Sequence, residues 1–532
     1  MISSFIDAIR SKFWIFPGLL LWAAFPPTAE KMDVLFALAP LIWLSRQGEV
    51  KKSFRSWFIS GLAFWIASLV WMPAIIKNDG PWPLVVLGWF ALAAYCALFF
   101  AAYGYLSARY WAMWISRSET PYISTALRIA GILLVEPILW CGLELIRSRL
   151  FGGFAWNQLG VVAVNGGFGS PAAVGGVYLC SAAIFLINGT IAGIIERFVA
   201  SWKARMRKAR PSDLSRLTRF RSFETLLAFA LVWGIYQLPG ERRSSSSDMG
   251  GLKVAMVQRN FPCCFRGFEE NPYIAYSNLL ANVEAFQPLL VVLPESAMSE
   301  FGPIDSPRAI EFAKKLSLRT GFVLAGGTRY GDGELFNSAA LYNGDEFTVY
   351  DKVHLVPFGE FIPGDKLFPW LQKFAPVGSC TPGDGALLQL MGIYFGVGIC
   401  YEDTDSALMR KYARDGAQFL CFITNDSWFS HSGEAEAHSW QAVARAIETG
   451  LPVVRTGNSG VTGTITPDGR ANWLSGPSGR PLVDHRGVMF DRISIGSGSP
   501  EPTPYVLLGD LPLGVAFACT LIFMIYYKRY GR

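Results

Sequence analysis

The chain is poor in charged residues, and this limits the kind of protein it can be. Only 17% of its 532 residues are charged, whereas 52% are hydrophobic. Such an apolar composition is unusual for a soluble protein of this length. We therefore expect a protein embedded in a membrane. The formal net charge of +6 is modest and gives no argument for a nucleic-acid partner. The 18 Trp and 39 Phe residues fit the aromatic belts found at lipid interfaces.

Cysteine and histidine do not form the patterns that disulfide frameworks or metal sites require. The nine Cys residues include no CxxC pair. Cys263 and Cys264 are adjacent, and adjacent cysteines rarely form a disulfide with each other. The four His residues are scattered and lack the spacing of metal ligands. We therefore expect no metal and no cofactor. There is also no internal repeat.

Apolar segments predict about eight transmembrane helices, since each crossing needs roughly 20 residues. They lie at 13–28, 33–45, 57–76, 83–106, 123–146, 172–195, 223–238 and 505–527. The first resembles a signal peptide, because Arg10 and Lys12 precede it, but we favour an uncleaved span because more spans follow. Glu136 and Glu144 are costly in lipid, so we expect them to face the protein interior or the interface.

Basic residues predict the orientation in the membrane. They cluster before the first span, in the loops after the second, fourth and sixth spans, and after the last span. The positive-inside rule places these segments, and both termini, in the cytoplasm. Seven expected spans lie between the cytoplasmic N-terminus and residue 240, and this odd number places residues 240–504 on the outer side. The basic run 203–221 has a less favoured alternative, which is binding to nucleic acid or anionic lipid.

Strands and helices alternate after residue 252, which predicts an α/β domain with a mostly covered sheet. Expected strands are 254–257, 289–293, 321–325, 337–342, 346–350, 393–399, 418–423, 452–456 and 461–466, and expected helices are 272–286, 307–319, 404–414 and 434–449. The chain thus divides into a helical membrane domain at 1–240, an α/β catalytic domain at 252–497 and a last transmembrane helix at 505–527.

Three residues of suitable chemistry follow apolar strands. Glu295 ends one such run, Lys352 another, and Cys400 a third. A carboxylate, an amine and a thiol at strand ends suit covalent catalysis, because the carboxylate takes the thiol proton and the ammonium favours the thiolate and the developing oxyanion. The alternative for each residue alone is structural, since a Cys after an apolar strand is usually a small buried hydrophobe.

Three motifs favour catalysis. Leu293-Pro294-Glu295, the block from Tyr350 to Glu360, and Gly398-Ile399-Cys400-Tyr401-Glu402 resemble the nitrilase (carbon–nitrogen hydrolase) superfamily. The block Lys-Val-His-Leu-Val-Pro-Phe-Gly-Glu from Lys352 most resembles the membrane branch, the apolipoprotein N-acyltransferases. The segment 151–156 resembles a loop of the same branch, so the resemblance extends along almost the whole chain.

The resemblance implies a four-layer αββα sandwich for the α/β domain and roles for individual residues. Glu295 is the implied general base, Lys352 the stabiliser of the oxyanion, and Cys400 the nucleophile that forms a thioester. Supporting or substrate-binding roles are expected for Glu360, Tyr401, Glu402, Trp428, Phe358 and Phe268. Arg445, Glu448, Arg455 and Asn458 also fit the family pattern, with structural roles favoured.

The implied reaction transfers a fatty acyl chain from a membrane phospholipid to an apolipoprotein. The acceptor is the α-amino group of an N-terminal S-diacylglyceryl cysteine, and the site is the outer face of a bacterial-type inner membrane. One alternative is a membrane-tethered amidase or nitrilase that acts on a C–N substrate, although a tether needs fewer spans. Another is a transporter or scaffold with a degenerate nitrilase domain, which the intact Glu–Lys–Cys set argues against.

Two apolar segments bear on the substrate site. The family usually places a Trp after residues 257–262, where this chain has Cys263 to Phe268, so Phe265 or Phe268 is expected to take its role. Residues 361–371 are rich in apolar side chains and are expected to form an exposed lid that dips into lipid, with ordinary core packing as the alternative.

Overall fold

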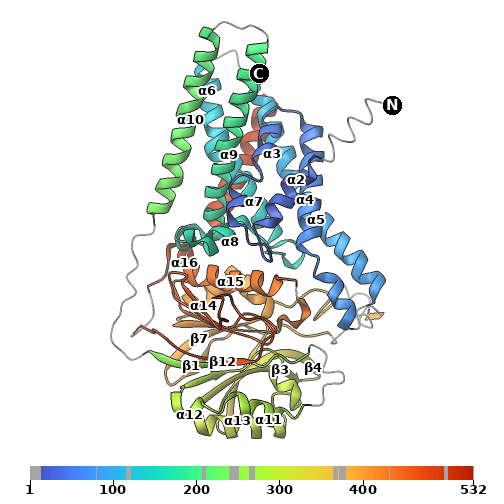
Figure 1. Ribbon diagram of the computed structural model, residues 1–532, viewed down its shortest axis with the longest axis vertical. Coiled ribbons are helices and arrows are strands. Elements are labelled where there is room, and N and C mark those ends of the chain that lie inside the picture. The colour runs from blue at the N-terminus through green and yellow to red at the C-terminus, as the bar shows by residue number, and fades with distance from the viewer. Residues whose placement is uncertain are drawn as a thin grey trace. The chain divides into compact units, whose positions relative to one another are not determined.

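The computed structural model describes residues 13–78, 81–115, 121–206, 211–238, 251–262, 270–362, 369–370, 379–429, 432–496 and 501–530 (Figure 1). The chain forms two compact units. The helical unit comprises Met1–Met72, Val86–Gly240 and Asp510–Arg532. The sandwich unit comprises Pro73–Val85 and Glu241–Gly509.

The helical unit is a bundle of α-helices. Its helices are α2 (Ile15–Ala23), α3 (Ala39–Ser45), α4 (Val50–Ser68), α5 (Trp82–Ile115, whose first turn belongs to the sandwich unit), α6 (Pro121–Ala130), α7 (Glu136–Arg147), α8 (Leu159–Ala163), α9 (Ala172–Met206), α10 (Pro211–Gln237) and α17 (Leu511–Tyr530). In the described part of the chain, three stretches are long and apolar enough to cross a membrane: Trp82–Trp114, Thr125–Arg147 and Ala172–Trp202.

The first two expected spans differ from the structure. They correspond to α2 and α3, which have nine and seven residues and are too short to cross a bilayer alone. Proline explains part of the difference: Pro26 and Pro27 follow α2, and proline cannot extend a helix because it lacks an N–H and clashes with the preceding turn. The structure therefore confirms three of the expected transmembrane helices as candidate spans, but it does not confirm a total of about eight.

A buried ion pair joins segments of the helical unit. Arg46 Nη2 lies 2.6 Å from Glu136 Oε2, and both side chains are 1% exposed. Trp111 Nε1 donates to the same carboxylate at 2.9 Å, and Arg46 Nη1 donates to the carbonyl oxygen of Gly189 at 2.8 Å. Glu144 is also buried and accepts from the backbone N–H of Leu159 at 3.0 Å. The prediction that both glutamates face the protein interior is confirmed.

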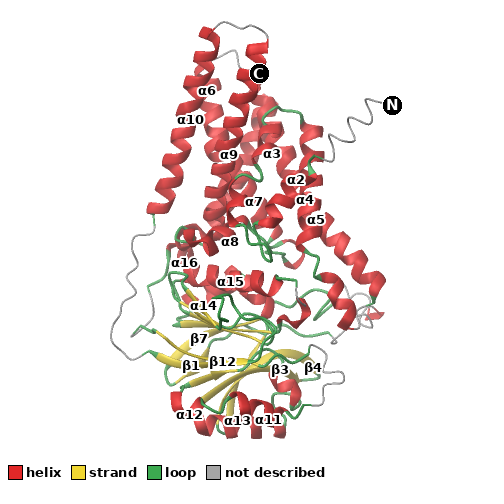
Figure 2. Ribbon diagram, in the orientation of Figure 1, coloured by secondary structure: helices red, strands yellow, loops and turns green. Residues whose placement is uncertain are grey.

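The sandwich unit contains two six-stranded sheets (Figure 2). The first has the order β12-β1-β2-β3-β4-β5, with β1 (Leu252–Gln258), β2 (Leu290–Val292), β3 (Phe322–Gly331), β4 (Glu334–Asn343), β5 (Glu346–Asp351) and β12 (Gly487–Ile493). The second has the order β11-β10-β9-β8-β7-β6, with β6 (Leu388–Leu390), β7 (Ile393–Ile399), β8 (Phe419–Thr424), β9 (Val453–Gly457), β10 (Gly463–Ile465) and β11 (Ala471–Trp473). Strands β1 to β3 are parallel, as are β7 to β9.

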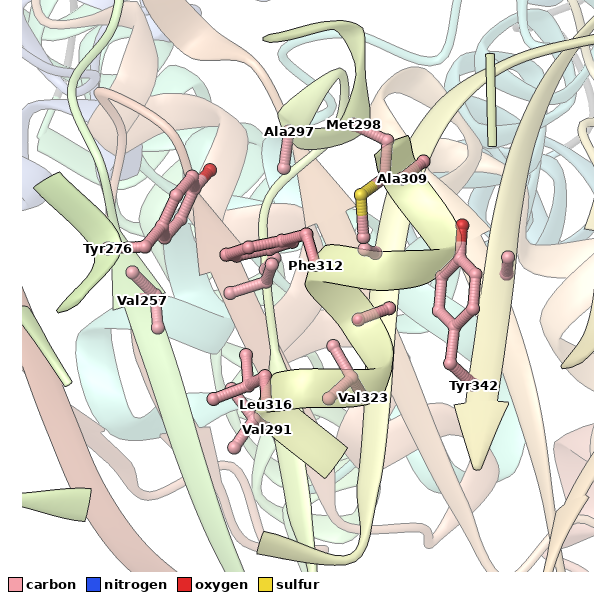
Figure 3. Packing of buried hydrophobic residues seen from close by; sticks show 14 of the residues in the cluster. Val257, Tyr276, Val291, Ala297, Met298, Ala309, Phe312, Leu316, Val323 and Tyr342 are labelled. Carbon is pink, nitrogen blue, oxygen red and sulfur yellow. The ribbon is translucent and has the colours of Figure 1, made fainter. Parts of the chain in front are cut away.

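Helices cover the outer face of each sheet, which completes the expected αββα sandwich (Figure 1). The first sheet is covered by α11 (Pro272–Leu279), α12 (Val283–Phe286) and α13 (Pro307–Thr320), and the second by α14 (Ser406–Arg414) and α15 (Glu434–Thr449). Figure 3 shows the core on the first sheet, where Phe312 of α13 packs near Tyr276 of α11. Val257 and Val291 supply strand residues to the same core, since alternate side chains of a strand share a face.

Three strands were not expected from the sequence. β6 and β11 have only three residues each, so neither forms a recognisable alternating run. β12 lies at a sheet edge, antiparallel to β1, and mixes polar with apolar residues. The expected helix 272–286 is divided into α11 and α12, with Leu280 ending the first helix. The remaining expected strands and helices of this unit are present; β7 and α15 have the expected bounds, and the others have shifted ends.

The buried ion pair predicts a strong asymmetry between two cations of the helical unit. Replacing Arg46 with Ala leaves the buried Glu136 carboxylate without its cationic partner. This is expected to destabilise the protein by about 3–5 kcal/mol. Replacing Lys52 with Ala removes an exposed ion pair with Glu49 and is expected to change stability by less than about 0.5 kcal/mol. Thermal unfolding of the two purified variants in detergent measures the difference. Equal unfolding temperatures would contradict the structural importance of the buried pair.

Candidate active site

Residues that follow three strands, β2, β5 and β7, converge on one site in the sandwich unit. Cys400 directly follows β7, Lys352 directly follows β5, and Glu295 lies shortly after β2. Glu295 and Lys352 are 7% and 1% exposed, and Cys400 is partly buried. The charges of Glu295 and Lys352 both act on the pKa of the Cys400 thiol, so the two sheets bring the three groups into mutual electrostatic range.

Backbone strain marks this site. Cys400 has a φ of +53° and begins the 3₁₀ turn η8 (Cys400–Thr404). Ser296, next to Glu295, and Phe358 each have a φ of +63°. A non-glycine residue in this region costs of order 1–3 kcal/mol, and such strain gathers at functional sites. Strain at Cys400 and at Ser296, which is next to Glu295, therefore supports a functional role for the site.

Asn337 of β4 links the two carboxylates of the site. Its Nδ2 donates to Glu295 Oε1 at 2.9 Å and to Glu360 Oε1 at 2.6 Å. The second oxygen of Glu295 accepts from the backbone N–H of Asn425 at 2.9 Å. Both carboxylate oxygens of Glu295 thus accept a hydrogen bond, one from a residue of the first sheet and one from a residue that follows a strand of the second sheet. Sequence reasoning missed Asn337, although a polar residue within the apolar run of β4 was a signal that could have identified it.

Glu360 orients the lysine. Lys352 Nζ donates to Glu360 Oε1 at 2.9 Å, while Glu360 Oε2 accepts from the backbone N–H of Val356 at 2.8 Å. The backbone of Glu360 also accepts from the N–H of Cys380 at 2.7 Å. This geometry suits the supporting role expected of Glu360, because it fixes the ammonium in one position.

Electrostatics favour a protonated thiol, a basic carboxylate and a charged lysine at rest. Burial and the charge of Glu295 raise the pKa of Cys400 well above its ordinary value, and Lys352 only partly opposes them. Burial lowers the pKa of Lys352, but Glu360, Cys400 and Glu295 together raise it above its ordinary value. Burial raises the pKa of Glu295, against the opposing charge of Lys352. A thiol that keeps its proton needs a base, and Glu295 has the raised pKa that proton transfer requires.

Glu402 fastens the nucleophile turn to the lysine loop. It is fully buried and accepts from the backbone N–H groups of Val353, His354 and Ile399 at 2.7, 3.0 and 2.7 Å. The hydroxyl of Tyr350 donates to it at 2.8 Å. Burial raises the pKa of Glu402 to about 7, while Lys352 and these donors oppose the rise. The geometry fits a supporting residue, since no surface of Glu402 is open to a substrate.

The other expected site residues lie around this centre with less defined roles. Tyr401 is partly buried and its ring meets His354 edge-on at 5.6 Å. Phe358 is 68% exposed, and Trp428 is partly buried in the 3₁₀ turn η9 (Asp426–Phe429). Phe268 and Phe265 lie outside the described residues. Contact of any of these with substrate stays a prediction.

The expected lid is wrong in one part. Ile362 is 6% exposed and belongs to the core, whereas Trp370 is 60% exposed. Residues 363–368 and 371 lie outside the described part of the chain. Among the residues that are described, no group of three or more His, Cys, Asp or Glu side chains is arranged to hold a metal ion.

Comparisons with known proteins find matches to both parts of the chain. A model of the apolipoprotein N-acyltransferase N-terminal domain matches residues 17–190, and a carbon-nitrogen hydrolase model matches residues 277–482. An apolipoprotein N-acyltransferase of Geobacter metallireducens is 33% identical over 533 residues, which cover 96% of this chain and 94% of the relative. That of Photobacterium profundum is 25% identical over 560 residues, covering 99% and 97%.

A solved carbon-nitrogen hydrolase from Helicobacter pylori is also similar, with 18% identity and a TM-score of 0.34. The match covers 45% of this chain and 87% of the Helicobacter pylori chain. This score is too low to support an inference.

The hydrogen bonds of Asn337 predict a measurable effect on the Cys400 thiol. Asn337→Asp replaces the shared donor with a third carboxylate, which raises the pKa of Glu295 further, so that less of Glu295 is ionised and able to accept the thiol proton. We expect alkylation of Cys400 by iodoacetamide at pH 7.5, followed by peptide mass spectrometry, to slow about tenfold. Asn343→Asp makes the same substitution at an exposed position of the same strand and is expected to leave the rate unchanged. Equal rates in both variants would refute the bridging role.

Proposed function

The chain belongs to the apolipoprotein N-acyltransferase family, and from that membership we propose that Cys400 is the residue that receives the acyl group. The enzyme is an acyltransferase of lipoprotein maturation, with lipoprotein and phospholipid as its substrates. The match of the family's N-terminal domain model to residues 17–190 favours this reaction over the alternative of a tethered amidase.

In the first half-reaction, Cys400 Sγ attacks the carbonyl carbon of an acyl ester of a membrane phospholipid. Glu295 takes the thiol proton as the C–S bond forms. The Lys352 ammonium and the backbone N–H of Tyr401 stabilise the oxyanion of the tetrahedral intermediate. When the intermediate collapses, the C–O bond breaks and the lysophospholipid oxygen takes the proton from Glu295. The enzyme is left with a thioester on Cys400.

In the second half-reaction, the α-amine of an N-terminal S-diacylglyceryl cysteine attacks the thioester. Glu295 accepts a proton from the amine, the Lys352 ammonium and the backbone N–H of Tyr401 again stabilise the oxyanion, and the C–S bond breaks. The thiolate recovers a proton from Glu295, and the product is an N-acylated lipoprotein. Water competes with the amine for the thioester, so the reaction requires a site from which water is excluded.

The observation that supports this proposal most is the fixed relation of base, cation and nucleophile. Asn337 ties Glu295 to Glu360, Glu360 holds Lys352, and the fields of Glu295 and Lys352 both reach Cys400. The arrangement supplies a proton acceptor and an oxyanion partner around one sulfur atom. These are the groups that an acyl-enzyme mechanism needs.

The arrangement in the membrane is part of the same proposal. We place the catalytic domain, 252–497, on the periplasmic side of a bacterial inner membrane, with both termini in the cytoplasm. We propose about eight membrane segments within residues 1–240 and 505–527, of which α2 and α3 are too short to cross a bilayer alone. The three long apolar helices and the basic loops support this proposal.

The proposed nucleophile predicts a covalent adduct. Incubation with phospholipid is expected to add the mass of one fatty acyl group to the wild-type protein, and Cys400→Ala is expected to abolish this adduct. Cys380→Ala is the matched control, because Cys380 is another buried thiol whose pKa is raised to about 11, by burial first and then by Glu360. Intact-protein mass spectrometry measures the adduct. An acyl group retained on Cys400→Ala would refute the assignment.

The proposed orientation predicts one-sided labelling. Single cysteines placed at exposed Ser478 and at exposed Arg55 near the start of α4 are expected to react with a membrane-impermeant maleimide from opposite sides. In intact spheroplasts, Ser478→Cys should be labelled and Arg55→Cys should not. Labelling of Arg55→Cys alone would reverse the proposed topology.

A further inference from the structure

Four charged side chains form a closed cluster beside the nucleophile turn. Asp403 belongs to η8, Asp426 to η9, His438 to α15 and Arg455 to β9. His438 Nδ1 lies 2.7 Å from Asp426 Oδ1, and His438 Nε2 lies 3.0 Å from Asp403 Oδ1. Arg455 Nη1 and Nη2 lie 2.5 and 3.3 Å from Asp403 Oδ2 and Asp426 Oδ2. All four side chains are at most 1% exposed.

The two nitrogens of His438 each face a carboxylate oxygen. A neutral imidazole has one N–H and one lone pair, so one nitrogen would turn its lone pair toward an anion. Only the doubly protonated ring suits both contacts. The Nδ1 contact has hydrogen-bond geometry, whereas the Nε2 contact is an ion pair without hydrogen-bond alignment.

Charge balance gives the same answer. The cluster contains two carboxylates and one guanidinium, so a neutral His438 would leave one uncompensated negative charge in the interior. A buried net charge is costly, whereas an imidazolium makes the cluster neutral. Burial lowers the pKa of His438, but Asp403 and Asp426 raise it to about 9, with Arg455 opposing.

The cluster fixes two segments that the catalytic groups depend on. Asp403 lies in the turn that begins with Cys400, and Asp426 follows Asn425, whose N–H holds the base Glu295. Arg445, two helical turns after His438, donates to the carbonyl oxygen of Thr404 at 3.0 Å. Helix α15 therefore holds the nucleophile turn at two points. A side chain at Gly460 would lie 1.8 Å from Asp426 Oδ2, so this close approach requires glycine.

We propose that His438 is a positioning residue for acyl transfer. As an imidazolium, it connects the nucleophile turn to the segment that holds Glu295. Together with Arg455 it also balances the negative charges of Asp403 and Asp426 beside Cys400. This inference rests on the proposed role of Cys400. Asp426 already raises the pKa of the Cys400 thiol. Loss of the imidazolium leaves that negative charge uncompensated and makes thiolate formation harder.

The test measures the thiol itself. The rate of Cys400 alkylation by iodoacetamide is followed by peptide mass spectrometry from about pH 6 to about pH 10, which covers the rising part of the profile of a thiol whose pKa is raised. We expect His438→Gln to move the profile to higher pH and to slow alkylation about tenfold at pH 7.5. His485→Gln, a histidine exposed on the same unit, serves as the control and is expected to leave the profile unchanged.

A charge-restoring double variant separates this role from a merely structural one. His438→Gln combined with Asp426→Asn leaves Asp403 paired with Arg455, so the cluster is neutral again. We expect the double variant to recover at least about half of the lost rate on a logarithmic scale, because coupled residues are not additive. A double variant as slow as His438→Gln, or slower, would overturn the proposal.

Nitrogen NMR of the ¹⁵N-histidine-labelled wild-type protein gives a test that does not depend on variants folding. Both ring nitrogens of His438 are expected to be protonated at pH 7.5, and a neutral tautomer would overturn the proposal. The two proposals fail separately. Persistent acylation of Cys400→Ala would refute the nucleophile assignment and leave the NMR and alkylation results for His438 unaffected.

Discussion

The site depends on one buried ammonium that shares its surroundings with two carboxylates. Lys352 is 1% exposed, and burial of an unpaired ammonium would cost several kcal/mol. Glu360 offsets that cost through a hydrogen bond, and Asn337 connects Glu360 to Glu295. Because the charges are paired, the cation stays in the position where we propose that the oxyanion develops. The fold supplies this arrangement by ending β5, β2 and β7 at a common site.

Backbone constraints complete the arrangement. The last strand before Cys400 contains Gly396 and Gly398, where an added side chain would lie 2.5 Å from Tyr412 and 2.6 Å from Phe422. Gly326 of β3 has a similar part, since a Cβ there would lie 2.7 Å from the Cα of Glu295. These glycines allow α14 and β8 to pack closely on β7, and the segment after β2 to pack closely on β3. The chain before Cys400 and the chain around Glu295 are therefore held tightly by their neighbours.

The sequence predicted what is encoded locally. Glu295, Lys352 and Cys400 each follow an apolar strand, so a shared chemical role could be predicted from the sequence. Their convergence could not, because β2 and β5 belong to one sheet, in which β5 is antiparallel to β4, and Cys400 follows β7 of the other sheet. Asn337 was missed because its importance comes from two partners distant in sequence. The four-member cluster around His438 was missed for the same reason, although Arg455 and Asp426 lay in segments that fit the family pattern. Edge strand β12 was missed because its partner β1 lies more than two hundred residues away. The short helices α2 and α3 show that apolar composition alone does not determine helix length.

The central claim is that Glu295 is the base that removes the Cys400 proton, and the pH dependence of acyl-enzyme formation tests it most directly. Because burial raises the pKa of Glu295, the wild-type rate should fall on acidification at a pH above the ordinary carboxyl range. Glu295→Gln should be slower by about 10²–10⁴ and should lose this acidic limb. An acidic limb of the same midpoint in Glu295→Gln, with an undiminished rate, would contradict the account.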